Sequence, residues 1–212
     1  MGTGTIRIGG LCAIASAAAI VPAYLAGSPD QPDAPGGVQS YVEGTASFVT
    51  ANGVLPLLHI LFGMLFLGVL TATLRTAAGP TGAVYTALIG GTVFLALTAA
   101  GLAAEVAVPA ALMQFDDVTA TGASQPVLGL SMWLYHYSQL GAGAMIFATA
   151  YVIWRTGVLP KWSAALAVLG VPALLHTWVG LPGAYSTAAW FALTGLLMLA
   201  LPPVVRMESV GV

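Results

Sequence analysis

The charged residues of this chain alternate along the sequence, basic in one set of gaps and acidic in the other. Long apolar stretches separate the gaps. The basic residues are Arg7, Arg75, Arg155, Lys161 and Arg206, and six of the seven acids are Asp30, Asp33, Glu43, Glu105, Asp116 and Asp117. Because loops rich in Lys and Arg stay in the cytoplasm, the alternation predicts a chain that crosses a membrane six times. Both termini are then cytoplasmic.

The composition supports a multi-pass protein of the plasma membrane. Hydrophobic residues make up 58% of the 212 residues and charged residues only 6%, whereas a soluble domain carries about a quarter charged residues. The net charge of −2 gives no reason to expect a nucleic-acid partner. The expected surroundings are the lipid bilayer.

We therefore predict an all-α fold, a six-helix transmembrane bundle forming one domain over residues 1–212. The expected spans cover residues 6–26, 48–74, 81–104, 127–154, 163–179 and 185–205. The first span also has features of a cleavable secretory signal, because Arg7 precedes an apolar run. Its apolar stretch is long enough to cross a bilayer, so we expect it to be retained.

Aromatic residues gather near both ends of the predicted spans. The outer group is Trp133, Tyr135, Tyr137, Trp178 and Tyr185, and the inner group is Trp154 and Trp162. Aromatic rings with a polar tip prefer the head-group zone of a bilayer, so these groups predict two interfacial belts.

The polar residues of the spans indicate where a site could lie. His59, His136 and His176 fall at similar depths in the outer half of their spans, and Gln139 follows His136 by one helical turn. Glu105 ends the third span on the same side. Because polar groups are costly in lipid, these side chains should turn inward. We predict a polar pocket in the outer leaflet, formed by His59, Glu105, His136, Gln139 and His176, with Tyr137 and Trp178 at its rim.

Several functions fit such a pocket. The first is binding of a lipid-like or small amphipathic molecule. The second is an intramembrane enzyme for an isoprenoid or lipid, with Glu105 and His136 as catalytic acid–base groups. The third is an accessory subunit, in which the polar residues only join helices and the partner is another membrane protein. A metal or haem site is the fourth. The histidines lack the HxxxH and CxxCH spacings, so we assign no metal ligands and leave the cofactor open.

The turn between the fourth and fifth spans, Arg155-Thr156-Gly157-Val158-Leu159-Pro160-Lys161-Trp162, carries a family resemblance. It resembles a basic-x-Gly-x-Leu-Pro-basic-Trp turn in a widespread bacterial family of six-helix integral membrane proteins of unknown function. The resemblance implies the six-helix layout for the whole chain. It implies no activity, cofactor or site residue.

Overall fold

The computed structural model describes residues 2–26, 45–114 and 124–203, and every element in these ranges is helical. The elements are α1 (Thr3–Ala26), α3 (Thr45–Val49), the π-helix η1 (Thr50–Val54), α4 (Leu55–Ala78), α5 (Gly82–Gln114), α6 (Ser124–Thr156), the 3-10 helix η2 (Lys161–Leu169), α7 (Gly170–Leu174), α8 (His176–Val179) and α9 (Leu181–Ala200). The predicted all-α class is confirmed over these ranges. The predicted loop acids between residues 30 and 43 and at 116–117, together with Arg206, lie outside them.

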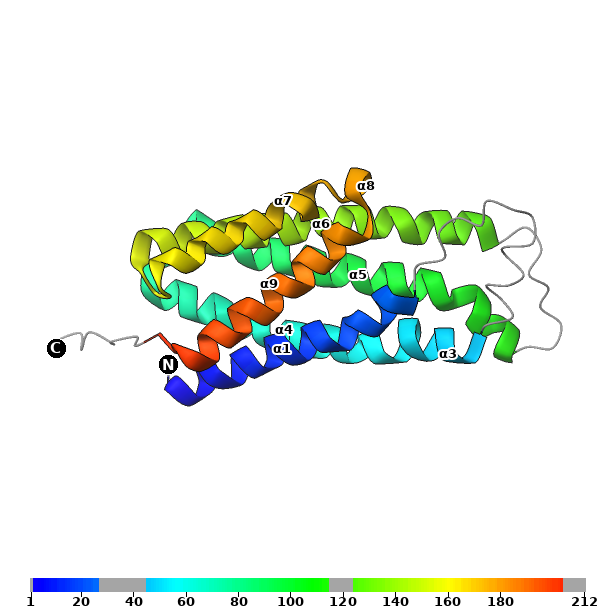
Figure 1. Ribbon diagram of the computed structural model, residues 1–212, viewed down its shortest axis with the longest axis horizontal. Coiled ribbons are helices and arrows are strands. Elements are labelled where there is room, and N and C mark those ends of the chain that lie inside the picture. Colours follow the sequence, from blue (N-terminus) through cyan, green and yellow to red (C-terminus); the bar gives the residue numbers. More distant parts are fainter. Residues whose placement is uncertain (1, 27–44, 115–123, 204–212) are drawn as a thin grey trace.

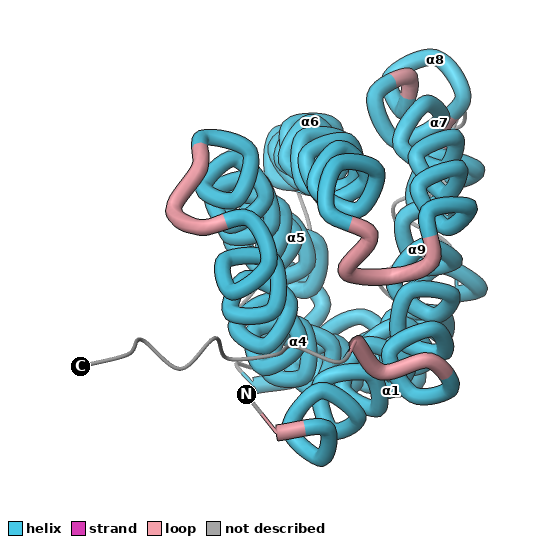
Figure 2. The backbone as a smooth tube through the Cα atoms, turned by 90° about the vertical axis from the view of Figure 1, so that its left-hand side faces the viewer, coloured by secondary structure: helices cyan, strands magenta, loops and turns pink. Residues whose placement is uncertain are grey.

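The helices form a closed ring in chain order. α1 packs against α4, α4 against α5, α5 against α6, and α6 against η2 and α7. α7 then packs against α9, which returns to α1 and closes the ring (Figures 1 and 2). The longest and closest of these pairings joins α5 and α6, two antiparallel helices of 33 residues each.

One end of the bundle carries the four described basic residues, and we call it the basic end. The start of α1, the end of α9 and the turns after α4 and α6 all lie there (Figure 1). Arg7, Arg75, Arg155 and Lys161 belong to these segments. Gly79 and Gly157 permit the two turns, because their φ values of 70° and 68° are in the left-handed region.

Four helical segments are long and apolar enough to cross a membrane: Thr3–Leu25, Ser47–Ala78, Gly82–Gln114 and Leu181–Ala200. α6 has sufficient length but falls outside this group. Its His, Gln, Tyr and Trp side chains lower its hydropathy, although many of them face the protein interior or suit the head-group zone. The prediction of several apolar spans is therefore confirmed for four segments.

The predicted boundaries differ most from the structure in two places, while the sixth span, expected over residues 185–205, is the helix α9 over Leu181–Ala200. α5 does not end at residue 104 but continues through Glu105 and Pro109 to Gln114, because a single carboxylate on the buried face does not break a helix. The segment expected as one helix over residues 163–179 is instead divided into η2, α7 and α8, with a break at Leu175. Apolar composition alone does not distinguish a 3-10 helix from an α-helix.

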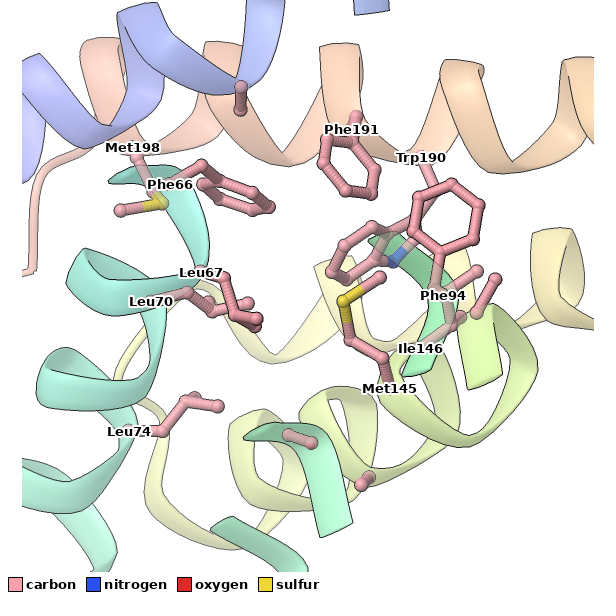
Figure 3. Close-up of a cluster of buried hydrophobic side chains, with 14 of the residues drawn as sticks. Phe66, Leu67, Leu70, Leu74, Phe94, Met145, Ile146, Trp190, Phe191 and Met198 are labelled. Carbon is pink, nitrogen blue, oxygen red and sulfur yellow. The ribbon is translucent and has the colours of Figure 1, made fainter. Parts of the chain in front are cut away.

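The middle of the core is aromatic and tightly packed (Figure 3). Phe66 on α4 lies 5.0 Å from Phe191 on α9, centroid to centroid, and Phe94 on α5 lies 5.8 Å from Phe191. Gly90 and Gly141 let α5 and α6 approach, since a Cβ on Gly141 would lie 2.6 Å from the Gly90 carbonyl oxygen. Such small-residue contacts are how membrane helices pack closely.

Candidate functional site

The predicted site residues lie far from the basic end, at similar levels. At a rise of 1.5 Å per residue, His59 lies about 28 Å from the basic end of α4. His136 lies about 30 Å from the basic end of α6, and Glu105 about 35 Å from that of α5. The hydrocarbon core of a bilayer is about 30 Å thick. A membrane that begins at the basic end therefore reaches its opposite boundary at these residues.

His59 is buried in the bundle, with only 2% of its surface exposed. Its Nδ1 atom lies 2.9 Å from the Ser16 hydroxyl and 3.0 Å from the Ser16 carbonyl oxygen. The Ser16 hydroxyl in turn donates to the His59 carbonyl at 2.9 Å. Since a carbonyl oxygen only accepts, Nδ1 carries the ring hydrogen, and Nε2 of the neutral ring is an acceptor. That Nε2 is buried and has no hydrogen-bond partner among the described residues.

Three further polar side chains lie close to the level of His59. The His59 ring packs 5.9 Å from Phe94 and 6.2 Å from Phe191, centroid to centroid. Thr98 on α5 and Thr187 on α9 each lie one turn from these phenylalanines, away from the basic end. Thr187 donates to Gln139 Oε1 on α6 at 2.7 Å.

We call His59, Thr98, Gln139 and Thr187 the polar layer. All four side chains are at most 2% exposed. Thr98 Oγ1 and Gln139 Nε2, like His59 Nε2, have no hydrogen-bond partner among the described residues. The layer thus presents one acceptor, one amide donor and one hydroxyl from three different helices.

His136 and His176 form a separate pair between α6 and α8. Their Nδ1 atoms are 2.8 Å apart, so one ring donates a hydrogen bond to the other. His176 is 8% exposed, whereas His136 is half-buried and packs edge-on to Trp133 at 5.4 Å. The direct bond leaves no room for a metal ion between the two Nδ1 atoms, since each Zn–N bond is about 2.0 Å long. No group of three or more His, Cys, Asp or Glu in the described part of the chain could hold a metal ion.

Glu105 lies farther from the basic end than the polar layer and is 2% exposed. It is near enough to the phenols of Tyr24 and Tyr135 for its charge to act on them. Tyr24 packs edge-on against Tyr185 at 5.5 Å. Glu105 therefore belongs to a tyrosine-lined cluster that joins α1, α5, α6 and α9.

Asn52 on the π-helix η1 lies at about the level of Glu105, because a Cβ on neighbouring Gly53 would contact Val106 at 3.5 Å. It is 1% exposed, and neither polar atom of its amide has a hydrogen-bond partner among the described residues. π-helical turns often occur at functional sites.

The aromatic residues expected at the outer rim divide into two sets. Tyr137 and Trp178 are 54% and 83% exposed, as a rim or a lipid-facing belt requires. Tyr135 is instead buried and Tyr185 half-buried, because both pack in the apolar cluster that contains Tyr24. On the inner side Trp154 and Trp162 are both exposed.

The structure thus brings the predicted site residues together in three groups at similar levels. His136 pairs with His176, His59 and Gln139 belong to the polar layer, and Glu105 faces tyrosines. Sequence reasoning missed Ser16, Asn52 and Thr187, whose single hydroxyl or amide groups carry no spacing signal. For Thr98 the sequence did hold a signal, because Thr98 and Glu105 are seven residues apart and share a helical face, which predicts that both side chains turn inward.

Comparisons of this chain with protein-family models, with curated proteins and with solved structures gave no match.

Proposed function

We propose that this chain is a six-span protein of the plasma membrane with both termini in the cytoplasm, and that it binds a small amphipathic molecule at the polar layer. The orientation rests on the basic end, where Arg7, Arg75, Arg155 and Lys161 gather. α6 is the fourth span. η2, α7 and α8 form the fifth, of which η2 and α7 together extend about 25 Å at the rises of 3-10 and α-helices.

The observation that carries the binding proposal is the set of buried polar atoms without partners in the polar layer. More than about nine in ten buried polar groups of proteins are hydrogen-bonded. A buried polar group without a bond costs about 1–3 kcal/mol. We infer that a bound molecule supplies the bonds of these three atoms, which belong to side chains of three helices at a similar level of the bundle.

The chemistry of the layer selects the head group of that molecule. His59 Nε2 requires a donor, and the Gln139 amide requires an acceptor. A hydroxyl group supplies both, and Thr98 can complete the set. The four side chains of the layer include no Lys, Arg, Asp or Glu, and a charged group without a counter-ion would be costly there. The ligand is therefore an uncharged, hydroxyl-bearing amphiphile, such as a long-chain or isoprenoid alcohol.

Thr98→Val tests this proposal against a matched control. Valine has nearly the shape of threonine but no hydroxyl. Thr149→Val is the control, because Thr149 on α6 is also 1% exposed and its hydroxyl also has no partner among the described residues. It lies seven residues from the basic end of α6, far from the polar layer.

The measurement is native mass spectrometry of the protein released from its own membranes, with identification of retained amphiphiles. We expect the wild type and Thr149→Val to retain an uncharged amphiphile. Thr98→Val should retain about fivefold less, as expected for one lost hydrogen bond. Equal retention by all three proteins, or retention by none, would contradict the binding proposal. The polar layer would then serve only to pack helices together, which favours the accessory-subunit function.

The His136–His176 pair favours a second candidate function, acid–base catalysis on the bound amphiphile. A half-buried imidazole bonded to a second imidazole can accept and release a proton near the head-group zone. Incubation of the protein with the recovered amphiphile should then yield a product that differs in mass or, for an isomer formed by proton transfer alone, in chromatographic retention, and His136→Ala should abolish its formation. An unchanged amphiphile after incubation with the wild type excludes this function.

A further inference from the structure

A surface groove runs between α6 and η2 near the basic end, well away from the polar layer. Its volume is about 470 Å³, within the range of small-molecule sites in proteins, about 300–1,000 Å³. One wall is the aromatic face of α6, formed by Phe147, Tyr151 and Trp154, and the other is η2. Three alanines of η2 line the groove, so its surface is apolar there.

The groove is apolar along its length and cationic at one end. Lys161 and Trp162 begin η2 and line the groove beside the turn, where Trp154 ends the opposite wall. Trp154 and Trp162 are each 63% exposed, and neighbouring Arg155 is exposed as well. This order of apolar wall, indole rings and cation matches the order of acyl chain, interface and head group in a lipid.

No acidic side chain of the described ranges lies near this cationic end. Glu105 is the only acid in residues 2–26, 45–114 and 124–203, and it lies about 35 Å from the basic end of α5. The positive charge of Lys161 and Arg155 at the mouth of the groove therefore favours an anionic group.

We propose that this groove binds an anionic phospholipid of the cytoplasmic leaflet, with an acyl chain against the alanines and its phosphate at Lys161. The leaflet assignment rests on the proposed orientation of the chain. A basic residue near an anionic bilayer surface contributes an attraction equivalent to about fivefold in affinity. The groove should thus select phosphatidylglycerol over phosphatidylcholine with the same acyl chains by about that factor.

The test is competitive binding in detergent. The full chain is incubated with an equimolar mixture of the two phospholipids, and native mass spectrometry counts each bound lipid. We expect the wild type to prefer phosphatidylglycerol about fivefold. Lys161→Gln should bring the ratio close to one, and Lys161→Arg should preserve it.

Two variants separate a groove site from general attraction to the basic end. Arg75→Gln removes an exposed cation at the same end, on α4 outside the groove, and should leave the preference unchanged. Ala165→Leu places a larger side chain at an exposed lining position and should reduce binding of both lipids. The proposal is overturned by a wild-type ratio near one, by equal losses in Lys161→Gln and Arg75→Gln, or by an Ala165→Leu variant that binds like the wild type.

These outcomes are independent of the polar layer and of the orientation. Thr98→Val should retain the phospholipid preference, even if no amphiphile binds at the polar layer. Because detergent micelles have no sides, an inverted topology would leave the preference intact and change only the leaflet.

Discussion

Ser16 on α1 and His59 on the neighbouring helix α4 are joined by hydrogen bonds in which each residue uses its side chain and its backbone carbonyl. The His59 Nδ1 atom lies 2.9 Å from the Ser16 hydroxyl, which itself donates to the His59 carbonyl at 2.9 Å. These bonds fix the orientation of the imidazole and leave Nε2 as the buried acceptor atom of the ring, without a hydrogen-bond partner among the described residues. The bond between α1 and α4 thus sets the chemistry of the proposed binding site.

Ser16→Ala should loosen this connection only slightly. His59 keeps its bond to the Ser16 carbonyl, 3.0 Å away, and interhelical hydrogen bonds in membranes contribute about 0.6 kcal/mol on average. We expect a loss of about 0.6 kcal/mol in the free energy of unfolding, measured by denaturant titration in mixed micelles. The control is Ser138→Ala, because the buried Ser138 hydroxyl donates to the Tyr135 carbonyl on its own helix and to no other helix among the described residues. Equal effects of the two substitutions would contradict a role for Ser16 in joining helices.

Gly141→Ala should destabilise the bundle strongly. Its added Cβ would lie 2.6 Å from the Gly90 carbonyl oxygen and 2.7 Å from the Phe94 nitrogen. Backbone atoms cannot move aside without separating α5 from α6, so we expect a loss of about 1–3 kcal/mol. Gly68→Ala is the matched control on α4, because a Cβ there has no atom within 4 Å. It should stabilise the helix by up to about 1 kcal/mol. A stable Gly141→Ala variant, measured by thermal unfolding in detergent, would exclude the close α5–α6 contact.

The His136–His176 bond predicts coupling between the two substitutions to alanine. Each single variant removes the same hydrogen bond, so the double variant should be less destabilised than the sum of the two. The coupling expected for one bond between membrane helices is about 0.6 kcal/mol and at most about 1.7 kcal/mol. A double-mutant cycle of unfolding free energies measures it. Strict additivity would mean that the two rings do not interact.

The orientation predicts which engineered cysteines an impermeant reagent can reach. The native Cys12 is first replaced by serine, so that the protein has no other thiol. Cysteine at position 33 or 117 should be labelled in intact cells, and cysteine at position 156 only after the membrane is opened. Labelling of position 156 in intact cells, with 33 and 117 protected, would reverse the topology.

The sequence was sufficient to predict the helical class and the basic end. Charge position and apolar length are local properties, and Arg75 and Arg155 mark two turns directly. The irregular helix over residues 161–179 was not predictable, because its composition is that of an ordinary apolar helix. Its contacts are set by α6, where Gly143 accommodates the Leu174 side chain.

The level of the candidate site along the bundle was predictable from the sequence. Which of its side chains contact one another was not. Counting residues along each span places His59 and His136 at similar depths. Which neighbour each imidazole contacts depends on how its helix is rotated about its own axis. That rotation follows from the packing of all the helices in the bundle. The pairing of His136 with His176, and of His59 with Ser16, therefore required the structure.

The most direct test of the binding proposal is a crystal structure of the protein grown from a lipidic mesophase containing its own membrane lipids. The proposal predicts ordered non-protein density within about 3.2 Å of both His59 Nε2 and Gln139 Nε2, continuous with an apolar tail. Apolar side chains or a lone water molecule against these atoms would contradict it.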